Sequence, residues 1–201
     1  MSTDHMQSLS NTAVSALFDA ASSTNPTPGG GCISAIGGYL GVALLLKAIR
    51  ISARRQPTET VYAEVEQQLL ALAARLMQSA QFDSDAFGFY IRALQLPKGS
   101  DVEKLTRRKA LQDASVAATE VALDILDLGN TVLQCAAQVH EKVLPTILAD
   151  VRASVEFVSA MNLVARENAQ ANLSGLALGG TLRERLSEAV AQHAILAATF
   201  K

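Results

Sequence analysis

A run of proline and glycine near the N-terminus, Pro-Thr-Pro-Gly-Gly-Gly at residues 26–31, has a composition that suits anion binding. The prolines stiffen the chain, and Gly29, Gly30 and Gly31 leave successive backbone amides unobstructed where a helix begins. A helix N-terminus with free N–H groups carries a partial positive charge that suits a carboxylate or phosphate. Pro28 and the three glycines are therefore candidate ligand-binding residues. The alternative is a tight turn that only leads the chain into a buried helix.

Two aspartates could exchange protons with a substrate. Asp83 is flanked at helical spacing by apolar residues, and burial beside them would raise the pKa of its carboxyl. Asp150 is the second candidate, and its alternative role is to complement a helix dipole after Pro145. Asp85 is the weaker neighbour, because residues two apart on a helix point to nearly opposite sides.

Two asparagines lie on the same predicted helix as Asp150. Asn168 and Asn172 are four residues apart, and 168 minus 150 is 18 residues, or five turns, so all three share one helix face. Eighteen residues also separate Asp150 from Asn168 by about 27 Å along a straight helix. They could serve opposite ends of an extended ligand or different sites of a dimer. Alternatively, the asparagines only satisfy buried backbone groups.

The elements that must position these residues are predicted to be helices. Long stretches rich in Ala, Leu, Val, Glu, Gln and Arg run between prolines, and we find no period-two alternation typical of strands. We predict an all-α, up-and-down bundle of about five or six helices. Helix starts are expected at Thr58, at a capping box from Ser100 to Glu103, after Pro145, and at Thr181. Gly129 and Asn130 indicate an end or a distortion inside the helix that Ser100 begins.

The composition limits the classes of protein. The 201 residues, 49% hydrophobic and 4% aromatic, are expected to form one domain, 1–201, with an aliphatic core. A net charge of −2 argues against nucleic acid as a partner. We expect no metal, because the three histidines are scattered and the two cysteines lie far apart. These residues are His5, His140, His193, Cys32 and Cys135.

The segment 29–46 carries no charge and reaches the lower length limit of a membrane span. Its six glycines dilute the hydrophobicity, and Lys47 and Arg50 close it, so we expect a buried central helix and no membrane association. Its small residues allow close approach of a second copy, which favours a homodimer. The polar N-terminus does not resemble a signal peptide, so a cytoplasmic location is expected.

The order of several motifs resembles the cyclodeaminase/cyclohydrolase family of folate one-carbon enzymes. The glycine run is similar to that family's, and Asp83-Ser84-Asp85-Ala86-Phe87 resembles its Asp-x-acidic-Ala-Phe segment. Leu96-Pro97-Lys98 is similar to the turn that follows. Further matches are Arg108, Ala110-Leu111-Gln112, Asp150, Asn168 and Asn172.

This resemblance implies a dimeric helical bundle that acts on a tetrahydrofolate derivative. The reaction would be the cyclisation of 5-formiminotetrahydrofolate to 5,10-methenyltetrahydrofolate with loss of ammonia, or the hydrolysis of the methenyl compound to 10-formyltetrahydrofolate. Asp83 and Asp150 would be catalytic. The implied ligand-binding residues are Pro28, Gly29, Gly30, Gly31, Asp85, Asn168 and Asn172.

The alternative is a non-catalytic homologue that binds a ligand or assembles with partners. Leu144, Thr146 and Ala149 stand where the family usually has polar residues, which favours this alternative.

Overall fold

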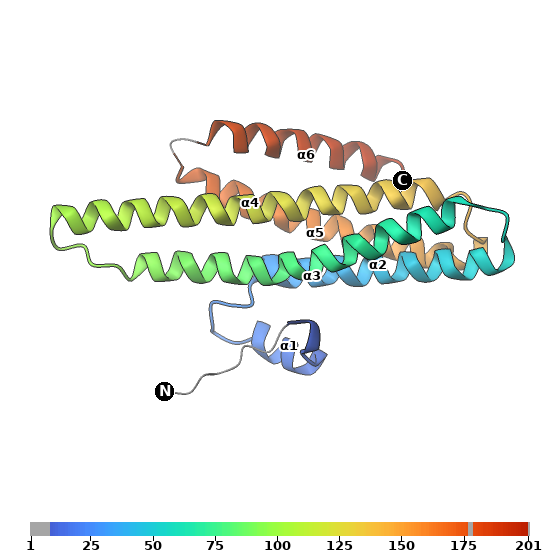
Figure 1. The fold of residues 1–201 in the computed structure, drawn as a ribbon, viewed down its shortest axis with the longest axis horizontal. Helices are drawn as coiled ribbons and strands as arrows, with labels where there is room; N and C mark the ends of the chain where they lie inside the picture. The colour runs from blue at the N-terminus through green and yellow to red at the C-terminus, as the bar shows by residue number, and fades with distance from the viewer. Residues whose placement is uncertain (1–8, 177–178, 201) are drawn as a thin grey trace.

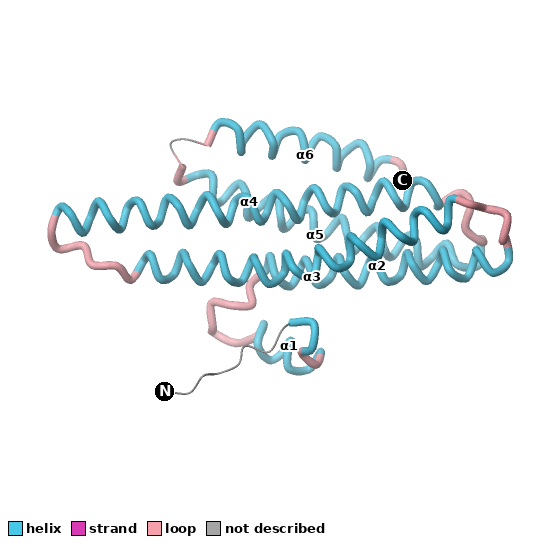
Figure 2. The backbone as a smooth tube through the Cα atoms, viewed as in Figure 1, coloured by secondary structure: helices cyan, strands magenta, loops and turns pink. Residues whose placement is uncertain are grey.

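The computed structural model describes residues 9–176 and 179–200, and over these residues the chain is helical without strands (Figures 1 and 2). The prediction of an all-α fold is confirmed. The elements are η1 (Leu9–Asn11), α1 (Val14–Ala21), α2 (Gly30–Arg55), α3 (Val61–Leu94), α4 (Asp101–Val139), η2 (Pro145–Ile147), α5 (Leu148–Ser174) and α6 (Gly180–Ala198).

The four long helices α2 to α5 form the bundle, and successive helices run in opposite directions (Figure 1). Helix α2 packs against α3 and α5, and α4 packs against the same two helices. Helix α6 lies along α4 and α5, whereas α1 lies beside the bundle with none of its residues buried (Figure 1). The tip of the α3–α4 hairpin extends well past the N-terminus of α2, so this end of the hairpin is left without α2 as a neighbour.

Helix α2 is apolar as the sequence predicts, but it is not buried on all sides: it packs against α3 and α5 and leaves Leu40 50% exposed. Its small residues allow α5 to approach closely: a Cβ at Gly38 would overlap Met161, and one at Gly41 would lie 2.9 Å from the Phe157 Cβ. In the described chain, α2 is the one helix long and apolar enough to cross a membrane, and half of the qualifying window is buried inside the bundle.

Local signals predicted some helix ends correctly and others wrongly. The capping box is confirmed, since the Glu103 N–H donates to Ser100 Oγ and the Ser100 N–H donates to Glu103 Oε2. The expected cap at Thr58 is wrong, because α3 begins after Thr60 and has no side-chain cap. The cap expected at Thr181 is also wrong: Gly179 precedes α6 without a side-chain hydrogen bond.

Gly129 does not end or distort α4, which continues from Asp101 to Val139. The glycine instead makes room for a buried polar side chain, because a Cβ at position 129 would overlap Asn162 Oδ1. Asn162 Nδ2 donates to Asn130 Oδ1 at 3.1 Å and lies 3.0 Å from His193 Nδ1, and Asn130 Nδ2 donates to the Ala189 carbonyl at 2.9 Å. These contacts join α4, α5 and α6, and tertiary packing thus outweighs the low helix propensity of glycine.

Replacing Gly129 with alanine is expected to destabilise the fold although alanine is the better helix former. The added methyl group displaces Asn162 and its hydrogen bonds, a cost of about 1–3 kcal/mol by overpacking. The measurement is urea unfolding at equilibrium. Gly180→Ala is the matched control, because a Cβ there meets nothing within 4 Å. Equal stability of the two variants would contradict this account of Gly129.

Candidate functional site

A cleft of about 310 Å³ lies where the glycine run meets α3, α4 and α5. The run supplies one wall, Asp83 and Phe87 come from α3, Ala118 from α4, and Asn168 and Asn172 from α5. The structure therefore brings together three groups of candidate residues that are far apart in sequence: the glycines, Asp83 and the two asparagines. The lining is Pro26, Thr27, Gly29, Gly30, Gly31, Asp83, Phe87, Ala118, Asn168, Ala171 and Asn172.

The start of α2 receives the carboxylate of Asp83. The Cys32 backbone N–H donates a hydrogen bond to this carboxylate, and a Cβ at Gly31 would overlap it. Gly31 is therefore the glycine that the protein's own packing requires, whereas a Cβ at Gly30 would lie 3.8 Å from Val164 in ordinary contact. The anion at the helix N-terminus is thus a side chain of the protein, placed at the edge of an open cleft.

The Asp83 carboxyl has the properties of a proton-exchanging group. Burial raises its pKa, and the hydrogen bond from the Cys32 N–H opposes part of that rise. Burial likewise raises the pKa of the Cys32 thiol, with Ser84 and Asp83 as its polar neighbours. A carboxyl whose pKa lies above its ordinary range can take up and return a proton near neutral pH more readily than a solvated one.

Asp85 does not line the cleft. Its Oδ1 accepts a hydrogen bond from Gln81 Nε2 at 3.1 Å, one helical turn before it. Pro28, which follows a cis peptide bond with Thr27, shapes the turn but is not among the lining residues.

Asn168 and Asn172 line the cleft from successive turns of α5 and are partly exposed. Neither amide forms a hydrogen bond within residues 9–176 and 179–200, so their donors and acceptors face the cleft without protein partners. The expectation that they merely satisfy buried backbone groups is therefore not supported. Each amide can donate to and accept from a bound molecule.

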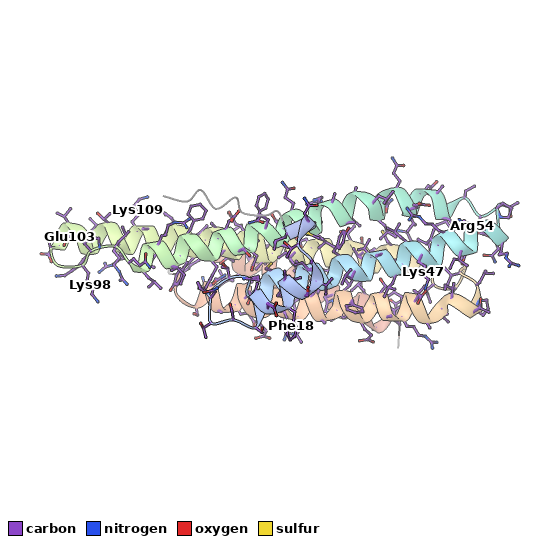
Figure 3. The ribbon with its side chains drawn as sticks, turned by 90° about the horizontal axis from the view of Figure 1, so that it is seen from below. Phe18, Lys47, Arg54, Lys98, Glu103 and Lys109 are labelled. Atoms are coloured by element: carbon purple, nitrogen blue, oxygen red, sulfur yellow. The ribbon has the colours of Figure 1, made fainter. Side chains whose placement is uncertain are left out.

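Asp150 lies far from this cleft, in the first turn of α5. Its Oδ2 is 2.7 Å from Lys47 Nζ in the second half of α2. Because Asn168 follows 18 residues later on the same straight helix, the separation is about 27 Å. Lys47 lies in the half of the bundle opposite to the end that holds Lys98 (Figure 3). Within one chain, Asp83 and Asp150 do not share a site.

A second, larger pocket of about 670 Å³ adjoins the first at the end of α5. We name it the cationic pocket; it is lined by Tyr90, Lys98, Lys104, Arg107, Arg108, Leu111, Gln112, Ser115, Gly175 and Leu176. This pocket was not predicted from the sequence, although the basic run at 107–109 was a signal for it. Phe87 and Ala118 of the first cleft were also missed, because their positions depend on how the helices pack.

No group of three or more potential metal-ligating side chains occurs among the described residues. His5 lies outside them.

Known proteins resemble this chain in sequence and in fold. The sequence model of the formiminotransferase-cyclodeaminase family matches residues 13–192. The chain is 30% identical over 181 residues to a methenyltetrahydrofolate cyclohydrolase of Methylorubrum extorquens, covering 89% of this chain and 87% of that protein. The structure of a formiminotetrahydrofolate cyclodeaminase from Thermotoga maritima shares the fold, with a TM-score of 0.84 at 20% identity, covering 96% of this chain and 95% of that one. The family resemblance drawn from the motifs is confirmed, and the chain belongs to the formiminotransferase-cyclodeaminase family.

Proposed function

We propose that this protein is a folate one-carbon enzyme that hydrolyses 5,10-methenyltetrahydrofolate to 10-formyltetrahydrofolate in the cleft beside Asp83. The observation that carries the proposal is a carboxyl of raised pKa at the edge of an open cleft, with two unpartnered amides opposite. The name of the Methylorubrum relative supports hydrolysis of the methenyl compound.

Asp83 would act first as a base and then as an acid. Its carboxylate takes a proton from the water that attacks the methenyl carbon, which gives a tetrahedral carbon between N5 and N10. The bond from this carbon to N5 then breaks while the carboxyl returns the proton to N5, and the hydroxyl on the carbon releases its proton to solvent as the C=O bond forms, leaving the formyl group on N10. Before attack, the same negative charge stabilises the methenyl cation.

The cyclodeaminase reaction is the second candidate, supported by the description of the family. Here N10 attacks the formimino carbon and loses its proton to Asp83, which delivers a proton to the amine that leaves as ammonia. Both reactions therefore need one carboxyl at one tetrahedral carbon. Assays with the two substrates separate them.

Residues 144, 146 and 149 differ from the polar residues that the family usually has there, but this difference does not argue for an inactive protein. Leu144, Thr146 and Ala149 lie at the end of the bundle that holds the Lys47–Asp150 ion pair. None of them lines the Asp83 cleft of its own chain. Asp83, Asn168 and Asn172, whose side chains the proposed chemistry requires, all line the cleft.

Replacing Asp83 with asparagine is expected to lower kcat by about 10² to 10⁴-fold while substrate affinity changes little, because asparagine keeps the size but cannot exchange a proton. In the native protein, kcat should rise with pH as the Asp83 carboxyl loses its proton, at a pH above the ordinary range for an aspartate. This dependence of kcat on pH should be absent in the variant. Turnover and affinity are measured separately across pH.

The control for this variant is Glu64→Gln, which removes an exposed acid from the same helix.

A raised carboxyl pKa favours the folded state at low pH, and that contribution is lost as pH rises through the folded-state pKa. Asp83→Asn should therefore not lower the free energy of unfolding at neutral pH. Unchanged turnover in Asp83→Asn would remove Asp83 from the mechanism.

A homodimer is part of the proposal, and the exposed apolar face of α2 and α5 supports it. Leu40 and Phe157 are 50% and 45% exposed, and Phe157 lies beside Gly37 on the same face. Large apolar side chains gathered on one face typically mark an interface. A dimer across this face would also bring the Lys47–Asp150 end of one chain toward its partner.

Sedimentation at micromolar concentration is expected to show a dimer, and Leu40→Arg should shift it to a monomer because a charge would be buried in the interface. Leu70→Arg is the matched control, since Leu70 is 49% exposed on α3. A monomeric native protein, or equal dissociation by both variants, would contradict an interface at Leu40.

A further inference from the structure

The cationic pocket has an excess of positive charge that the protein does not neutralise. Four basic side chains line it and no acidic side chain does. Lys104 Nζ pairs with Asp101 at 2.9 Å, and Arg107 Nε donates to the Leu94 carbonyl at 3.3 Å. Lys98 and Arg108 have neither an ion pair nor a hydrogen bond within the described parts of the chain. Two exposed cations therefore remain available to an anion.

The cationic pocket continues the Asp83 cleft along the same three helices. On α3 the wall passes from Phe87 to Tyr90, whose rings stack with centroids 6.4 Å apart. On α4 it passes from Ala118 to Ser115, three residues away. On α5 it passes from Asn172 to Gly175. A ligand longer than the cleft can thus extend into the cationic pocket within one turn of each helix.

The chemistry of the proposed substrate matches this sequence of surfaces. A tetrahydrofolate carries its one-carbon unit near a benzoyl ring, which an amide joins to a glutamate with two carboxylates. The ring and amide span roughly 10 Å, about three extended residues. The Asp83 cleft contains no basic side chain, so the carboxylates of a ligand whose reacting carbon lies at Asp83 need cations outside it.

We propose that the cationic pocket binds the glutamate carboxylates of the tetrahydrofolate substrate, with Lys98 and Arg108 as the cations that contact them. The inference rests on the proposed function and adds the residues that hold the far end of the substrate. Tyr90 provides the aromatic wall along which the benzoyl ring passes. Arg108 can present a planar fork to a carboxylate, and Lys98 adds a mobile point charge.

The test compares two substrates that differ only in the anionic tail: 5,10-methenyltetrahydrofolate and 5,10-methenyltetrahydropteroate, which lacks the glutamate. The double variant K98Q/R108Q should raise KM for the folate by about 10- to 100-fold, the effect of losing charge-assisted hydrogen bonds. Its kcat should remain near the native value. KM for the pteroate should not change, because its one carboxylate is attached directly to the benzoyl ring and it lacks the two glutamate carboxylates that Lys98 and Arg108 would contact. The native protein should bind the folate more tightly than the pteroate, and this difference in affinity should become smaller at high salt.

The matched control is Lys109→Gln. This variant also removes a positive charge, at the residue that follows Arg108. Lys109 Nζ pairs with Asp113 Oδ2 at 3.1 Å and lies outside the cationic pocket. Figure 3 shows Lys109 and Lys98 on opposite sides of this end of the bundle. KM for the folate should therefore stay at the native value in this variant.

Three other outcomes would each contradict a specific claim. If the double variant raises KM equally for folate and pteroate, or for neither, the cationic pocket does not bind the glutamate although the enzyme assignment stands. If K109Q raises KM as much as K98Q/R108Q, the effect reflects total charge and the assignment of these two residues is wrong. If the native protein neither binds nor converts either compound, the proposed function and this inference fail together.

Discussion

The site depends on one close approach, that of the Asp83 carboxylate to the first turn of α2. This approach requires glycine at position 31, since any Cβ there would overlap the carboxylate. It places a partly buried anion against the Cys32 N–H, so its charge is favoured by one hydrogen bond and disfavoured by desolvation. Desolvation dominates, and the carboxyl has a raised pKa at the edge of a cleft that a substrate can enter.

The same device, a glycine facing a larger side chain, sets the spacing of the bundle. Gly38 and Gly41 bring α5 close to α2, and Gly129 admits Asn162 between α4 and α5. With this spacing, the last turns of α5 lie opposite Asp83 and present Asn168 and Asn172 to the cleft. The geometry of the site is therefore a consequence of helix packing more than of any local loop.

The sequence predicted what is encoded locally, including the helical class and the capping box at Ser100. It also predicted a raised pKa for the Asp83 carboxyl, but from the apolar residues beside it on its own helix, whereas the carboxyl lies against the first turn of α2. It failed where distant helices decide the outcome. Gly129 looked like a helix end because its partner Asn162 is remote in sequence. Lys98 and Arg108 were noted only as matches to the family's motifs, since the pocket that they line is completed only when the end of α5 packs beside them. Both the contact between Gly129 and Asn162 and the cationic pocket depend on the register in which the helices pack. This register cannot be read from a single sequence.

The most direct test of the central claim is a crystal structure with 5,10-methenyltetrahydrofolate bound to Asp83→Asn, a variant expected to retain the ligand. We expect the one-carbon unit beside residue 83, with Asn168 and Asn172 within hydrogen-bond distance of the ligand. We also expect the glutamate carboxylates near Lys98 and Arg108. A ligand bound elsewhere, with its one-carbon unit remote from residue 83, would contradict the assignment of the cleft.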